Sequence, residues 1–172
     1  MGLGLLDAPL RLTWDFPDLV IGQEDACLPS IASRIADAGV FYVTLQKTPL
    51  RHPALGEVLQ VFADRCQVLL SCHGHSDELE RLAQLPVPVS QLLLDVADFV
   101  TAKQNVDTER LLSVLQLLRQ ARHEPVLTLT PLRNNLTVLP DLVRFCSEHQ
   151  VAKFKLPNAK IGDSFHDYLP AV

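Results

Sequence analysis

Phe41-Tyr42-Val43-Thr44-Leu45-Gln46-Lys47-Thr48-Pro49-Leu50-Arg51-His52-Pro53-Ala54-Leu55 begins as an apolar run of strand length and continues through a short loop into the start of a helix. From Leu55 onward, apolar residues recur at i, i+3, i+4 and i+7 through Val58, Leu59 and Phe62. This spacing is typical of an amphipathic helix. The stretch therefore predicts one strand–loop–helix unit.

The same unit recurs along the chain. Apolar runs of strand length occupy residues 10–16, 40–45, 67–71, 91–96, 125–130 and 151–156. Helical segments are predicted between them: one ending at Gly39, one over 55–62, one with Ser76 as N-cap, one starting near Asp107, and one from about Pro140 to His149. This alternation predicts an α/β fold with a parallel sheet and right-handed crossovers.

The chain length limits the architecture. A closed eight-stranded barrel takes about 250 residues, so the 172 residues here fit a partial (βα)6 TIM-like barrel, open and parallel. A doubly wound parallel sheet is the alternative, although no glycine-rich nucleotide motif marks a switch point. No linker interrupts the pattern. We therefore expect a single partial-barrel domain over residues 1–172, with 158–172 as a capping tail.

The composition argues against several classes of function. With a net charge of −5 and scattered Lys and Arg residues, the chain is not expected to bind nucleic acid. No apolar run approaches the roughly 18 to 20 residues of a membrane span, and the N-terminus lacks the features of a secretory signal. We therefore expect a cytoplasmic protein. The four cysteines form no C-x-x-C pair and are predicted to be reduced thiols used in packing.

The loop quoted above resembles part of a radical S-adenosylmethionine (radical SAM) domain. In that family the second strand runs into Gly-Gly-Glu-Pro, which positions the methionyl amine of SAM, and then commonly into Leu-x-His-Pro-x-Leu. Here 49–55 keeps the second half, whereas Gln46-Lys47-Thr48 replace Gly-Gly-Glu. Leu12-Thr13-Trp14-Asp15 resembles the family's first strand. The loop after it should carry C-x3-C-x2-C for a four-iron, four-sulfur cluster, but Cys27 stands alone there.

Further matches follow in the family's order. Ser71-Cys72-His73-Gly74 occupies the place of Thr-Asn-Gly, 92–95 that of a strand ending in Ser-x-Asp, and Arg133-Asn134-Asn135 that of Arg-x-Asn. The pattern most resembles the peptide-maturing branch, whose members usually add a cysteine-rich SPASM extension that is absent here. The resemblance implies a partial (βα)6 barrel. Because the cluster cysteines and Gly-Gly-Glu are both missing, it also implies a pseudoenzyme without a cofactor.

A ligand site is predicted at the carboxyl ends of the strands, where loops of parallel α/β folds converge. The polar residues expected there form a rim suited to a peptide or a small anion: Asp15, Gln46, Lys47, Thr48, His73, Asp95, Arg133, Asn134 and Lys155. Ordinary loop polarity is the alternative explanation.

Cys72-His73-Gly74-His75 brings metal-binding residue types together in the sequence. Thiolate and imidazole are good zinc ligands, and Asp95 would add a carboxylate. However, C-H-x-H matches no standard ligand spacing, so helix capping around Ser76 is the favoured interpretation and no metal is predicted. Acid–base chemistry by Asp15 and Asp95 is a further enzymatic alternative.

We expect a noncatalytic radical SAM-like domain that binds a peptide or a radical SAM enzyme in a peptide-modification system. The alternatives are a small (βα)-barrel enzyme with metal-assisted or acid–base chemistry, and an N-terminal fragment of a longer radical SAM/SPASM-like protein. An open barrel leaves unpaired backbone groups on its first and last strands, which a tail, another subunit or an edge-protecting device must cover. Association with another chain, including a second copy, follows as a hypothesis.

Overall fold

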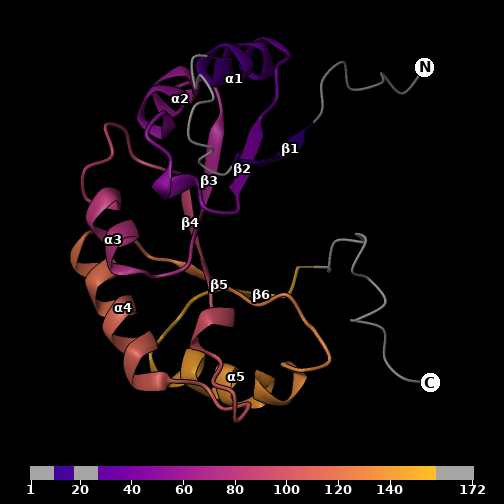
Figure 1. Cartoon of the computed structure of the whole chain (residues 1–172), viewed down its shortest axis with the longest axis vertical. Coiled ribbons are helices and arrows are strands. Elements are labelled where there is room, and N and C mark those ends of the chain that lie inside the picture. Colours follow the sequence, from indigo (N-terminus) through magenta and orange to yellow (C-terminus); the bar gives the residue numbers. More distant parts are fainter. Residues whose placement is uncertain (1–9, 18–26, 158–172) are drawn as a thin grey trace. The chain divides into compact units, whose positions relative to one another are not determined.

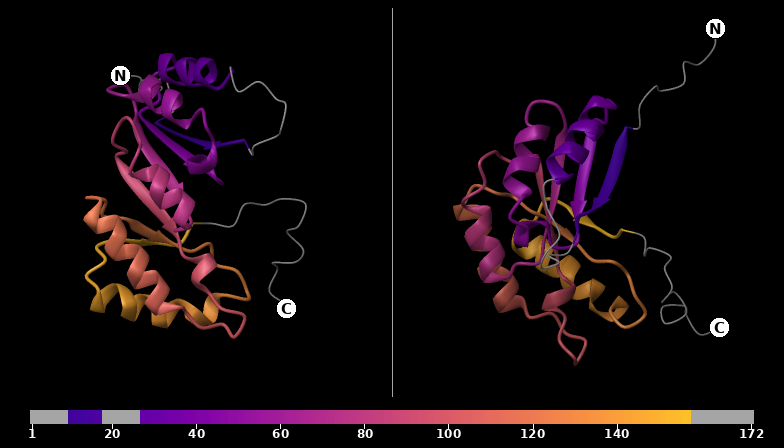
Figure 2. Two further views of the ribbon diagram at one scale, coloured as in Figure 1. Left: turned by 60° about the vertical axis from the view of Figure 1, so that its left-hand side comes forward. Right: turned by 45° about the horizontal axis from the view of Figure 1, so that its top comes forward.

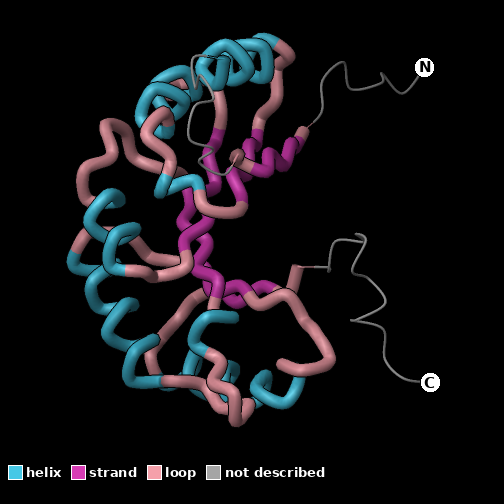
Figure 3. Tube along the Cα trace, in the orientation of Figure 1, coloured by secondary structure: helices cyan, strands magenta, loops and turns pink. Residues whose placement is uncertain are grey.

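The computed structural model describes residues 10–17 and 27–157 of the chain. They form two compact units, the first ending at Leu92 and the second beginning at Leu93. Strands and helices alternate within both units (Figure 3). The predicted capping tail, 158–172, lies outside the described residues, and the single domain over 1–172 stays a prediction.

The first unit contains three parallel strands, which Figure 1 labels together with the α-helices of this unit. The strands are β1 (Arg11–Asp15), β2 (Tyr42–Gln46) and β3 (Gln67–Cys72). The helices are α1 (Leu28–Asp37), the 3₁₀ helix η2 (Pro49–Arg51), α2 (Leu55–Phe62) and α3 (Ser76–Leu82). Helices α1 and α2 contact each other and lie side by side in the views of Figure 2.

The second unit begins within β4 (Gln91–Asp95). Its further strands are β5 (Val126–Thr128) and β6 (Phe154–Lys155), and both of its strand pairs are parallel. The helices are η3 (Ala97–Phe99), α4 (Thr108–Gln120), η4 (Leu136–Val138) and α5 (Leu139–Glu148). Along the sheet the strand order is β1-β2-β3-β4-β5-β6, which confirms the predicted open, parallel α/β fold. Among the described helices, none has both the length and the apolar character that crossing a bilayer requires.

The two faces of the sheet in the first unit differ in character. Register rows on one face are apolar: Leu12, Val43 and Val68, followed by Trp14, Leu45 and Leu70. This face packs against the helices, because the Trp14 ring lies 6.4 Å from that of Phe62 in α2. The opposite face carries Thr13 beside Thr44 and Asp15 beside Gln46. Polar groups of the strands therefore gather on the face that is not packed against α2.

Local sequence explains the end of α1 and the start of α4. Helix α1 ends before Gly39, which has a φ of 74°. The carboxylate of Asp107 accepts a hydrogen bond from the Arg110 backbone at the start of α4. The prediction for α3 is wrong by one residue, since His75 is the N-cap and Ser76 is the first helical residue. The physical reason is Glu78, which turns inward and bonds the backbone ahead of the helix.

Candidate functional site

Polar side chains of β1 and β2 form a strip on the open face of the first unit. Asp15 and Gln46 are register partners at the ends of their strands, and Thr13 and Thr44 form the row before them. Asp15 and Thr13 are exposed, Gln46 is half-buried and Thr44 is buried. The strip therefore offers a carboxylate, a carboxamide and a hydroxyl to a ligand. Two residues of the predicted rim, Asp15 and Gln46, are thus neighbours.

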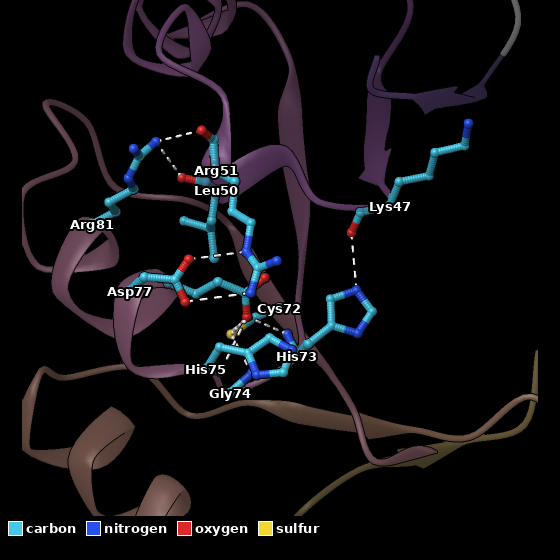
Figure 4. Close-up of polar contacts among 10 residues, drawn as sticks. Lys47, Leu50, Arg51, Cys72, His73, Gly74, His75, Asp77 and Arg81 are labelled. Carbon is cyan, nitrogen blue, oxygen red and sulfur yellow. Dashed lines mark hydrogen bonds and ion pairs between the residues drawn. The ribbon is translucent and has the colours of Figure 1, made fainter. Parts of the chain in front are cut away.

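The loop after β2 is tied to the end of β3. His73 Nε2 lies 3.1 Å from the carbonyl oxygen of Lys47, as the dashed line in Figure 4 marks. A carbonyl only accepts hydrogen bonds, so this contact requires the proton on Nε2 of His73. Lys47 itself has a φ of 68°, in the left-handed region that favours glycine. It stands at the position where the radical SAM resemblance expects the second glycine.

Replacing Lys47 with glycine is expected to raise the free energy of unfolding by about 0.5 to 1 kcal/mol. Glycine removes the cost of a left-handed β-carbon, and the greater freedom of the unfolded chain offsets part of that gain. The measurement is urea unfolding of the two proteins. Lys103→Gly is the control, because Lys103 is exposed but is not at a positive φ, so glycine there should be destabilising. A loss of stability in Lys47→Gly would contradict the strain argument.

Glu78 organises the turn between β3 and α3 from a fully buried position. Its Oε2 accepts hydrogen bonds from the backbone N–H groups of His73, at 2.8 Å, and His75, at 3.3 Å. The Sγ atom of Cys72 lies 3.7 Å from the same oxygen and accepts from the N–H of Gly74 at 3.3 Å. The other carboxylate oxygen, Oε1, is buried without a hydrogen-bond partner among the described residues. One carboxylate thus contacts three residues of the turn, Cys72, His73 and His75.

The Cys72-His73-Gly74-His75 segment does not form a metal-binding cluster. Burial, together with the nearby Glu78 carboxylate, raises the pKa of the Cys72 thiol to about 12. The His73 and His75 rings stack with centroids 6.2 Å apart. In the part of the chain that the structure describes, no three His, Cys, Asp or Glu side chains gather closely enough to hold a metal ion. The segment is a tightly bonded turn.

Helix α3 is held against the loop that contains η2. Arg81 donates hydrogen bonds to the carbonyl oxygens of Leu50 and Arg51, and Arg51 forms an ion pair with Asp77 at 3.0 Å (Figure 4). In the same loop, the buried ring of His52 accepts from the Ala54 N–H through Nδ1 at 3.2 Å. The retained His-Pro part of the family-like motif therefore supports the loop structurally.

In the second unit, two residues of the predicted rim, Asp95 and Lys155, share one register row with Thr128. Thr128 of β5 is the partner of Asp95 in β4 and of Lys155 in β6, so it lies between an acid and a base. The Thr128 hydroxyl donates to the Leu94 carbonyl, and Asp95 Oδ1 accepts from the Ala97 N–H at 2.9 Å. Arg133 and Asn134 are exposed in the loop after β5. This row therefore offers the negative charge of Asp95 and the positive charge of Lys155 to a ligand of this unit.

Three residues that shape these clusters were not among the predicted site residues: Glu78, Thr128 and Asn135. Buried Asn135 holds the loop after β5, because its side chain accepts from the Leu132 N–H at 2.7 Å and donates to the Thr130 carbonyl at 2.9 Å. The spacing of a capping box gave no signal for Glu78, because it counts from the N-cap, which the sequence places at Ser76 and the structure has at His75. Thr128 had no local signal, since its role comes from the register of three strands.

Comparison with known proteins supports the fold. No protein-family model and no curated protein matches the sequence. Among solved structures, Streptococcus suis SuiB bound to S-adenosylmethionine is similar, with a TM-score of 0.71 and 14% identity over 98% of this chain and 45% of that one. A second structure of SuiB gives a TM-score of 0.67 and 16% identity over 94% and 42% of the two chains. The chain has a radical SAM-like fold. It spans less than half the length of SuiB.

The residues present do not fit an iron–sulfur cluster of the radical SAM type. Such a cluster takes three thiolates from one loop, whereas residues 15–27 contain Cys27 alone. Cys27 is exposed at the start of α1, while Cys66, Cys72 and Cys146 belong to other parts of the fold. Burial raises the pKa of each of these three thiols, which disfavours the thiolate that binds iron.

Proposed function

We propose that this chain is a noncatalytic radical SAM-like domain that binds an extended peptide segment on the polar face of its strands. The observation that carries the proposal is the shortage of cysteines that could bind iron. The fold is radical SAM-like, but one cysteine stands in the loop where a cluster needs three. Gln46-Lys47-Thr48 also replaces the residues expected to position SAM. The scaffold therefore keeps its strand-end site without the groups that perform the chemistry.

The polar strip of the first unit suits a peptide. The carboxamide of Gln46 is both a donor and an acceptor, as a peptide group requires, and the Asp15 carboxylate beside it accepts from N–H groups or cations. The side chain of Lys47 is exposed next to this pair. These groups match the polar backbone of an extended chain better than an apolar small molecule. The partner peptide is either free or part of a larger protein, including a radical SAM enzyme.

The noncatalytic part of the proposal is tested on anaerobically purified protein. Iron, sulfide and zinc are measured on one sample, and SAM binding is measured by calorimetry on the same sample. We expect no stoichiometric iron and no SAM binding. Reconstitution of a cluster that cleaves SAM would overturn the proposal. Stoichiometric zinc that is lost in His73→Ala would instead favour a metal-assisted enzyme.

The peptide-binding part is tested with an unselected peptide library displayed on phage and selected against the full chain. Peptides enriched on the wild type should bind Gln46→Ala about 10-fold more weakly, because about 1.4 kcal/mol of hydrogen bonding is lost. Gln60→Ala is the matched control, since Gln60 is exposed on α2 and away from the strip. Failure to enrich any peptide, or equal losses in both variants, would reject this site.

A further inference from the structure

Strand β1 presents a backbone edge. It is the first strand in the sheet order, and its described pairing is with β2 alone. The Leu10 carbonyl accepts from the Tyr42 N–H, and the Phe16 N–H donates to the Gln46 carbonyl. Because N–H and C=O groups of alternate residues point to the same side of a strand, the even-numbered residues face β2. Arg11, Thr13 and Asp15 therefore direct their backbone groups away from β2.

The side chains along this edge are complementary to themselves. Arg11 and Asp15 carry opposite charges at equal distances from Thr13, and all three side chains are exposed on one face of the strand. In an antiparallel pairing centred on Thr13, each Arg11 lies opposite the Asp15 of the other strand, and the two threonines face each other. Opposite charges and paired threonines are favourable cross-strand neighbours. On the other face, Leu12 lies opposite Trp14.

The backbone pattern fits the same arrangement. Residues that direct N–H and C=O toward a partner form the hydrogen-bonded pairs of an antiparallel ladder, and these residues recur at every second position. Arg11, Thr13 and Asp15 occupy such positions. The pairing would form about six backbone hydrogen bonds between two copies. The outward backbone groups and the side-chain charges thus favour the same antiparallel register, centred on Thr13.

We infer that β1 is an interface for a second copy of this chain, which pairs antiparallel to it about a twofold axis through Thr13. Such an interface is isologous, so each copy supplies the same Arg11, Thr13 and Asp15. The Arg11 guanidinium lies 5.5 Å from the centre of the Tyr42 ring on β2, so in the dimer it turns from β2 toward the Asp15 of the second copy. The Asp15 carboxylate has two oxygens and accepts from more than one donor. A peptide that lacks this charge pattern would form backbone hydrogen bonds with the edge but would not form the two Arg11–Asp15 ion pairs.

The interface is short, so the expected dimer is weak. Stable protein interfaces bury roughly 1,200 Å² or more, which a five-residue strand alone does not supply. We expect a dissociation constant of roughly 10 μM to 1 mM. The inference uses the edge of β1 and does not depend on peptide binding at Gln46, so either proposal can fail without the other.

Charge reversal on the full chain tests the register. By sedimentation equilibrium, Arg11→Asp and Asp15→Arg should each weaken self-association at least about 10-fold, since each places like charges opposite one another. Mixed in equal amounts, the two variants should associate as well as the wild type, because every charge pair is then complementary. The double variant R11D/D15R should also associate by itself. Its edge carries no excess charge, which separates register-specific pairing from general attraction between oppositely charged proteins.

A second variant keeps the test independent of the Arg11–Tyr42 contact. Thr13→Pro removes the central outward N–H, and proline is tolerated on the solvent side of an edge strand. We expect it to be folded, by circular dichroism, and monomeric. A wild type that is monomeric at about 1 mM, or variant mixtures that stay monomeric, would overturn the inference. So would a monomeric wild type that binds an extended peptide at this edge with the same sensitivity to Thr13→Pro.

Discussion

Replacing Glu78 with alanine is expected to lower the free energy of unfolding by about 3 kcal/mol. The Glu78 carboxylate is fully buried and accepts from the backbone N–H groups of His73 and His75. Without it, these partly buried donors lose their charged acceptor, at roughly 1 to 3 kcal/mol each. The truncated side chain also leaves space in the turn. The loss should appear in urea unfolding as a lower midpoint with an unchanged slope.

Two further variants separate the causes of this loss. Glu80→Ala is the control, because Glu80 lies on the same helix but is exposed, so its effect should stay within about 0.5 kcal/mol. Glu78→Gln keeps one carbonyl acceptor in the same shape and should lose clearly less than the alanine variant. Equal effects of Glu78→Ala and Glu80→Ala would mean that the buried carboxylate is not what holds the turn.

The fold was predictable because its signals are local and repeated. The apolar run before Gln46 and the helical spacing from Leu55 to Phe62 each specify an element, and the structure has β2 and α2 there. Glycine at 39 and aspartate at 107 mark a helix end and a helix start through backbone conformation and capping. Alternating elements then leave few topologies for a parallel sheet. The similarity to SuiB supports the same fold.

The candidate site was predictable only in part. Position at a strand end is enough to predict that Asp15 and Gln46 are polar rim residues, but their side-by-side placement follows from the β1–β2 register. Glu78 was missed for a physical reason. A glutamate in the first turn of a helix normally faces solvent and favours the helix dipole. Its burial depends on how the loop from Cys72 to His75 folds over it, which no local pattern encodes.

The turn that Glu78 organises also determines the chemistry of its cysteine. Burial and the adjacent carboxylate raise the pKa of Cys72 from 9.0 to about 12. At pH 8 its thiolate is therefore about a thousand-fold rarer than that of an ordinary cysteine, and the thiolate is the reactive form. We expect iodoacetamide to modify the exposed Cys27 in native protein while Cys72, which is also fully buried, reacts at least about a thousand-fold more slowly. Peptide mass spectrometry over time, with urea-unfolded protein as the reference, measures both rates.

The same raised pKa makes stability depend on pH in the alkaline range. The unfolded chain loses the Cys72 proton near pH 9, whereas the folded chain keeps it until about pH 12. Its contribution is therefore fully present below pH 9 and is lost between pH 9 and 12, at about 1.4 kcal/mol per pH unit. Other groups titrate in this range, so the measurement is the difference between wild type and Cys72→Ala. If the two proteins lose stability in parallel above pH 9, or if Cys72 is alkylated as fast as Cys27, then the thiol does not lie beside a buried carboxylate. The turn between β3 and α3 would then have to be built differently.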